Sequence, residues 1–255
     1  MDGETTSRAV ARAEPSAGAS AGPSAWGQWV RFVLRPRLPA ERVRFGWAAI
    51  GEVGWLLLLY LLITLPLAAG LSWLAGRTGV QTPVFEELAR RGPAFTLLVG
   101  ALVLPVGEEI AFRAWLDGRG RHFAFFGALV GIMLSVIAAV HFIGGGAALA
   151  GSVAVASFGW VMLGWWLGRR WGSGVPLWFA RGFPGLYFGS ALLFGLAHMS
   201  NYALDRPLLL LPFVLPQTLG GLLFGYARVR HGMWANIALH STSNAIFLGL
   251  SMNGF

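Results

Sequence analysis

Apolar residues fill seven long runs of this chain, and polar residues gather between the runs. Each run is long enough for a helix to cross a hydrocarbon core of about 30 Å. We therefore predict an all-α fold, a polytopic transmembrane helical bundle. Residues 171–185, WGSGVPLWFARGFPG, leave room for an interfacial or re-entrant piece, so about seven to eight spans are expected. The seven runs, with boundaries good to a few residues, are 49–75, 94–116, 123–143, 146–168, 183–200, 207–227 and 232–251.

Composition supports a membrane protein. Only 12% of the residues are charged, against about a quarter in soluble domains. The net charge is +8, and all 19 basic residues behind it are arginine, without lysine. Arginine at membrane boundaries explains that charge better than a nucleic-acid partner does, so the expected partner is the lipid bilayer. The arginine bias indicates a bacterial protein, and the absence of cysteine excludes disulfides, thiolate ligands and a cysteine nucleophile.

The arginines divide unequally between the two sides of the predicted bundle. Twelve lie in residues 26–47 or in the second, fourth and sixth loops, and four lie in the other loops. Because positive residues are retained on the cytoplasmic side, the side with twelve should be cytoplasmic. We expect a multi-pass protein of the bacterial cytoplasmic (inner) membrane with its N-terminus inside. His122 and His231 fall in loops on this side, and the sequence assigns them no role.

The N-terminal region differs from the rest. Residues 1–25 are rich in Ala, Ser, Gly and Pro, which predicts a disordered tail. In residues 26–47, Trp26 and Trp29 follow helical spacing with Arg31 between the turns. This pattern fits a basic amphipathic helix on the membrane surface and equally an ordinary juxtamembrane linker. We divide the chain into a tail plus juxtamembrane segment, 1–45, and a transmembrane domain, 46–255.

Glycine pairs four residues apart occur at 127/131, 185/189 and 221/225. Small residues at this spacing let transmembrane helices approach closely. We expect packing within the bundle rather than homodimerisation, and the oligomeric state stays open.

Three ionisable residues interrupt the second predicted span. Glu109 and Arg113 are four residues apart, so they share a helix face and can pair. Glu108 points about 100° away and is free to face a cavity. Two neighbouring carboxylates repel in a poorly solvated place, which prepares one of them as a general base. Pro105 removes a backbone donor just before the pair. A salt-bridged helix end explains Glu109 and Arg113 but leaves Glu108 without a role.

Two later spans carry further polar pairs. Phe194 and His198 are four residues apart in one span, and His240 and Asn244 are four apart in another. Taken alone, each pair also suits a satisfied core histidine or hydrogen bonding between helices. Together with Glu108 they supply a carboxylate and imidazole to deprotonate water and donors for an oxyanion. If the three spans converge on one polar cavity, the combination predicts hydrolysis.

These motifs resemble a known family. EEIAFR fits EExxxR, FGLAH fits FxxxH and HSTSN fits HxxxN, in this order over about residues 100–250. The set resembles the CPBP family, which includes the type II CAAX prenyl endopeptidases and the bacteriocin-processing and self-immunity enzymes once called abortive-infection proteins. The resemblance implies a glutamate-dependent intramembrane endopeptidase, so that residues 46–255 would be a transmembrane peptidase domain acting on a membrane-associated protein or peptide.

The resemblance also assigns roles. Glu108 would be the general base, and His198 would help to activate the water. His240 and Asn244 would stabilise the oxyanion, while Glu109 and Arg113 would support the site. Phe194 would pack beside it.

No cofactor is expected, although a zinc ion held by Glu108, His198 and His240 would also be a catalytic pattern. The metal-free mechanism is preferred because Asn244 beside His240 suits an oxyanion and is a poor zinc ligand.

Two questions stay open. Glu108 and His240 should lie moderately deep from the cytoplasmic side, whereas His198 falls toward the outer end of its predicted span, unless that span is shifted or broken. The alternative function is a non-catalytic membrane protein, a transporter or an assembly or immunity scaffold, with the same polar network. The physiological substrate is not defined by the sequence.

Overall fold

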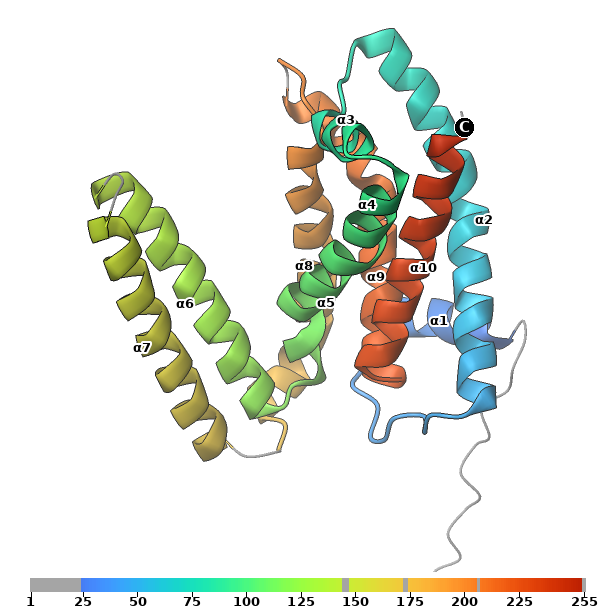
Figure 1. Ribbon diagram of the computed structural model, residues 1–255. Helices are drawn as coiled ribbons and strands as arrows, with labels where there is room; N and C mark the ends of the chain where they lie inside the picture. The colour runs from blue at the N-terminus through green and yellow to red at the C-terminus, as the bar shows by residue number, and fades with distance from the viewer. Residues whose placement is uncertain (1–23, 144–146, 172–173, 206, 254–255) are drawn as a thin grey trace, which may run out of the picture.

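The computed structural model describes residues 24–143, 147–171, 174–205 and 207–253, so most of the predicted disordered tail lies outside it. These residues form an all-α bundle, as predicted, and they contain no strand beyond an isolated bridge between Gln81 and Ala203 (Figure 1). The elements are α1 Ser24–Leu34, α2 Trp47–Thr78, α3 Pro83–Arg90, α4 Pro93–Leu98, η1 Val99–Val103, α5 Leu104–Arg113, η2 Ala114–Asp117, α6 Gly120–Ile143, α7 Ala147–Trp171, α8 Leu177–Ala197, η3 His198–Asn201, η4 Pro207–Val214, α9 Leu215–Arg230 and α10 Met233–Met252.

The long helical segments coincide with the seven predicted runs. Within the described residues, four of them are long and apolar enough to cross a membrane: Trp47–Thr78, Pro93–Asp117, Leu149–Arg170 and Pro207–Arg230. The exact number of crossings stays a prediction. Helix α8 starts at Leu177, six residues before the predicted span, and continues to Ala197 through Pro184. In the described part of the 171–185 segment, Trp171 ends α7 and residues 177–185 form the first turns of α8, so it contains no separate helical piece.

Helices α2, α5, α8, α9 and α10 gather into one bundle, and the α6–α7 hairpin extends from one end of it (Figure 1). Apolar residues of α2, α9 and α10, among them Leu56, Leu223 and Leu239, form one buried cluster. Aromatic residues of α8, with Trp115 and Leu116 of η2, form a second cluster. Together the two clusters hold the helices that carry the polar motifs.

Glycine sets the closest approach in this bundle. A Cβ on Gly221 would lie 2.8 Å from Ala191 Cα, and one on Gly225 would lie 3.0 Å from the Tyr187 ring. The 221/225 pair therefore packs α9 against α8, as predicted. The 185/189 pair has nothing within 4 Å of either Cβ position, so it plays no such part within the bundle.

The arginine-rich loops meet at one end of the bundle. Asp117 forms ion pairs with Arg42 at 2.7 Å and with Arg228 at 3.1 Å. His122 Nδ1 lies 2.8 Å from the same carboxylate. Buried carboxylates require such partners, because an unpaired charge away from water is costly. His122 is thus part of an ion-pair cluster, although the sequence assigned it no role.

The first helix, α1, forms within the segment left open between amphipathic helix and linker. The Trp26 indole N–H donates to the carbonyl of Trp55 at 2.7 Å, and Trp29 and Phe32 pack against the buried clusters. Val30 and Leu34 remain exposed. The aromatic side of α1 is therefore covered by the protein itself.

Candidate active site

The glutamate motif lies just after an irregular turn. The Leu104 N–H donates to the carbonyl of Val99, five residues back, which defines the π-helical turn η1. The next donor in this register would serve Gly100, but it belongs to Pro105, which has no N–H. The Asn244 side-chain amide supplies the missing donor to the Gly100 carbonyl at 3.0 Å. Asn244 therefore fixes the segment that precedes the glutamates.

Glu109 is fully buried and holds three partners. Arg113 Nη1 donates to its Oε1 at 2.5 Å, as the four-residue spacing predicts, and Asn236 Nδ2 donates to its Oε2 at 2.5 Å. His240 Nδ1 lies 2.8 Å from Oε1. A carboxylate only accepts hydrogen bonds, so His240 donates from Nδ1 and its Nε2 edge is turned away from Glu109.

Glu108 faces the two histidines from the other side. Its Oε2 lies 3.6 Å from His240 Nε2 and 3.7 Å from His198 Nε2. The His198 Nδ1–H donates to the carbonyl of Phe194 at 2.7 Å, which fixes that ring too. The side chain of Glu108 is 29% exposed, whereas that of His198 is 14% exposed and that of His240 is 4% exposed. The structure thus brings Glu108, His198 and His240 together, with Glu108 the most accessible.

Aromatic rings complete the surroundings. Phe194 contacts the His198 and His240 rings at centroid distances of 4.5 and 5.6 Å. Phe224 stacks on His240 at 4.8 Å, and the Arg113 guanidinium lies 3.8 Å over the Phe194 ring. These contacts limit ring rotation and place the buried cation against an aromatic face. Phe194 therefore packs beside the histidines, in the position that the motif gives it.

The depth conflict between His198 and the other two residues disappears in the structure. His198 follows directly after the last residue of α8. Phe112 contacts Phe194 while Trp115 contacts Phe179, so α5 and α8 run in opposite directions. Glu108 lies one turn before Phe112 and His198 one turn after Phe194, so the antiparallel helices bring the two motifs to the same level without a break in α8.

Other residues support this arrangement and were not found from the sequence. Asn236 lies one turn before His240 and looks like an ordinary polar residue in an apolar helix. Arg228 donates to the carbonyls of Arg113 and Ala114 at 3.0 and 2.6 Å, and so caps the end of α5. Its long-range partners leave no local pattern in the sequence.

His231 is a further residue without an assigned role. Its side chain is buried, and its Nε2 lies 3.6 Å from Glu52, which also pairs with Arg230 at 2.6 Å. This cluster joins α2 to the turn between α9 and α10. It fixes the start of the helix that carries His240.

A zinc ion at this site would need Glu108, His198 and His240 as its ligands. Glu108, His198 and His240 converge, but within the described residues no group of three His, Asp or Glu side chains has an arrangement that could hold a metal.

Comparison with known proteins gave one family match. Residues 169–246 match the family model described as type II CAAX prenyl endopeptidase Rce1-like. This segment runs from the end of α7 into α10 and contains FxxxH and HxxxN, whereas the EExxxR motif lies before it. No curated protein and no solved structure matches the chain. The matched segment contains two of the three motifs, and over residues 169–246 the chain is similar to the type II CAAX prenyl endopeptidases of the Rce1-like family.

Proposed function

We propose that this protein is an intramembrane endopeptidase that hydrolyses a peptide bond of a membrane-associated protein or peptide with a water molecule activated by Glu108. The observation that carries the proposal is the approach of both imidazole Nε2 atoms to Glu108 Oε2, at 3.6 and 3.7 Å. These distances exceed a direct hydrogen bond, and they suit a water bridging carboxylate and imidazole. The Rce1-like match supports a membrane protease as the general class.

The chemistry follows from the hydrogen bonds of each group. The carboxylate of Glu108 accepts a hydrogen bond, and neutral His198, with its proton on Nδ1, accepts another at Nε2. A water that donates to both directs a lone pair at the scissile carbonyl. Glu108 takes the proton as the water oxygen adds to the carbonyl carbon, and it returns that proton to the leaving amine. Water, peptide and the two products then balance without a further reactant.

The tetrahedral intermediate needs donors for its oxyanion. Asn244 and His240 are the proposed donors, and because His240 Nδ1 already donates to Glu109, His240 donates to the oxyanion from Nε2 only in its doubly protonated form. One hydrogen of the Asn244 amide already serves Gly100, and a side-chain amide has two, so one remains for the substrate. Glu109 and Arg113 orient His240 from the buried side, and Phe194 keeps water from both rings. This division makes Glu108 and His198 reactive and makes Glu109 a positioning residue.

The test compares membrane and secreted proteomes of the native host carrying either the wild type or Glu108→Gln. The amide keeps the shape of the carboxylate but takes no proton. Glu86→Gln, on the exposed helix α3, is the matched control. A protein whose terminus is processed with wild type and Glu86→Gln but stays intact with Glu108→Gln would identify the substrate. Unchanged termini at equal protein levels would refute the peptidase and favour a non-catalytic scaffold.

Zinc is measured in the same purified proteins. The proposal expects activity on the identified substrate to survive chelation and dialysis. Stoichiometric zinc, with activity lost on chelation and restored by zinc, would overturn the metal-free mechanism and retain the endopeptidase.

A further inference from the structure

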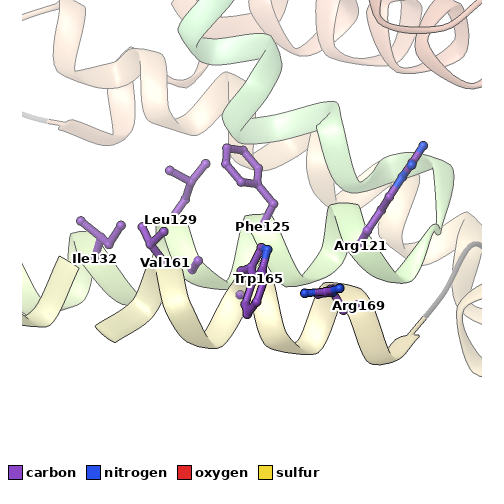
Figure 2. A pocket seen from close by; sticks show the side chains of 10 residues that line it. Arg121, Phe125, Leu129, Ile132, Val161, Trp165 and Arg169 are labelled. Atoms are coloured by element: carbon purple, nitrogen blue, oxygen red, sulfur yellow. The ribbon is translucent and has the colours of Figure 1, made fainter. Parts of the chain in front are cut away.

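A groove of about 430 Å³ runs between α6 and α7, away from the candidate active site. Figure 2 shows Arg121 and Arg169 at one end of it and Leu129 and Val161 farther along, with Trp165 between. The rest of the lining is apolar or glycine. The groove therefore has a cationic end and a long apolar wall.

The apolar wall has no protein cover in the described residues. In the span Leu149–Arg170, none of the most apolar window is buried inside the protein. Phe125 and Val161 are each 49% exposed and Trp165 is 57% exposed. In a chain whose long helices cross a membrane, such side chains are solvated by lipid acyl chains. The wall is thus suited to a hydrocarbon chain lying along the hairpin.

The two arginines differ from those inside the bundle. Arg113, Arg228 and Arg230 each pair with a buried carboxylate. Arg121 and Arg169 are exposed, and within the part of the chain that the structure describes neither has an acidic partner. Arg169 lies 4.7 Å over the Trp165 ring, which orients its guanidinium beside the groove. Two exposed cations without an acidic partner at one end of a groove favour an anion, and a guanidinium fits a phosphate.

We infer that this groove binds an anionic phospholipid, with the headgroup phosphate between Arg121 and Arg169 and one acyl chain along Phe125, Leu129 and Val161. The position agrees with that occupant. Both arginines lie at the arginine-rich end of the bundle, which by the positive-inside rule meets the cytoplasmic leaflet, where anionic lipids bind basic pockets between helices. A zwitterionic lipid offers the same chain but adds a cation beside the two arginines. The inference is independent of the peptidase activity.

The full-length protein is purified in detergent-free nanodiscs of phosphatidylcholine, a zwitterionic lipid. The nanodiscs are titrated with phosphatidylglycerol, and the lipid bound to the protein is counted by native mass spectrometry. The test variant is Arg121→Gln with Arg169→Gln. The matched control is Arg170→Gln with Arg181→Gln, which removes the same charge from the same end. Arg170 even repeats the contact of Arg169, lying 4.3 Å over Trp166, but it does not line the groove.

We expect wild type and control to retain one phosphatidylglycerol in preference to phosphatidylcholine, and the groove variant to lose that preference. Each arginine–phosphate contact accounts for about a fivefold change in affinity, so the double variant should bind about 25-fold more weakly. Equal losses in the two double variants would overturn the inference, because they would indicate general charge attraction. Equally tight binding of glycerophosphoglycerol, the deacylated headgroup, would overturn it too, because the apolar wall would then contribute nothing.

Discussion

At the scale of single residues, the geometry around Glu109 is decisive. This carboxylate is buried and accepts from Arg113, Asn236 and His240. Because the contact to His240 uses Nδ1, Glu109 determines which edge of that ring faces Glu108. A residue that never touches substrate can thus control the chemistry through ring orientation. Asn236 is the partner whose loss should reveal this, since it leaves the Glu109–Arg113 pair intact.

We expect Asn236→Ala to lower kcat by about tenfold while KM changes little, because Glu109 loses one anchor and His240 loses its fixed position. Stability should fall by about 1–3 kcal/mol, the cost of an unsatisfied buried acceptor. Steady-state kinetics on the substrate identified with Glu108→Gln, and thermal unfolding in micelles, measure the two effects. Asn253→Ala is the control, since Asn253 lies just after the same helix and is exposed.

Asn236→Gln tests the role more closely. It restores an amide donor of greater reach, so part of kcat should return. A kcat equal to wild type in Asn236→Ala would show that Glu109 needs no third partner to orient His240.

At the scale of elements, two local devices shape the helices that carry the site. One is the π-helical turn η1, where Pro105 leaves the Gly100 carbonyl without a helical donor and Asn244 of α10 supplies one. The other is the close contact of α8 and α9 at Gly221. Both features connect different helices, so a substitution at either one should affect the stability of the bundle and not only of its own helix.

The Pro105–Asn244 link predicts a double-mutant result. Asn244→Ala should cost about 1–2 kcal/mol in the wild-type background, because the Gly100 carbonyl loses its donor. In a Pro105→Ala background the new N–H can serve that carbonyl, so the same change should cost markedly less. Thermal unfolding of the four proteins gives the coupling. An equal loss of unfolding free energy in both backgrounds would show that Asn244 does not stabilise the π-helical turn. Oxyanion stabilisation would then be its only proposed role.

The helix contact at Gly221 predicts a steric cost. Gly221→Val places a Cβ 2.8 Å from Ala191 Cα, and backbone cannot move aside as a flexible side chain can. The free energy of unfolding should fall by about 1–3 kcal/mol. Gly185→Val, on an open face of α8, should change it little. Unfolding in micelles checks both, and similar losses in the two variants would mean that the α8–α9 contact does not set the stability.

At the scale of the whole molecule, the structure places the arginine-rich loops at one end and the candidate site among the helices between the ends. Arg42 and Arg228 both reach Asp117, and Arg230 reaches Glu52. These ion pairs gather segments from the juxtamembrane region, η2 and α9 at a single end. That end should face the cytoplasm if the arginine distribution follows the positive-inside rule.

The orientation can be measured directly, because the chain has no native cysteine. We expect a membrane-impermeant maleimide to label Glu86→Cys in α3 on intact spheroplasts, and to label Arg37→Cys only after lysis. Both positions are exposed. Labelling of Arg37→Cys alone before lysis would reverse the proposed topology, with the N-terminus outside.

Much of the architecture could be predicted from local pattern. The seven apolar runs coincide with the long helical segments, and the four-residue spacing of Glu109 and Arg113 led to the observed pair. The start of α8 at Leu177 was missed, because Gly and Pro in residues 171–185 disguise its first turns. The catalytic roles of Glu108, His198, His240 and Asn244 remain predictions, although the first three side chains lie together.

By itself, the sequence determined the helices, the apolar surface and the ionisable groups that interrupt it, because hydrophobic periodicity and i, i+4 spacing are local properties of a helix. Only the tertiary structure decided how Glu108 faces two histidines, why Asn244 binds Gly100, and that Asn236 and Arg228 support the site. These contacts join residues up to 144 positions apart. Their geometry depends on helix direction, tilt and close packing at glycine, which no short window of sequence contains.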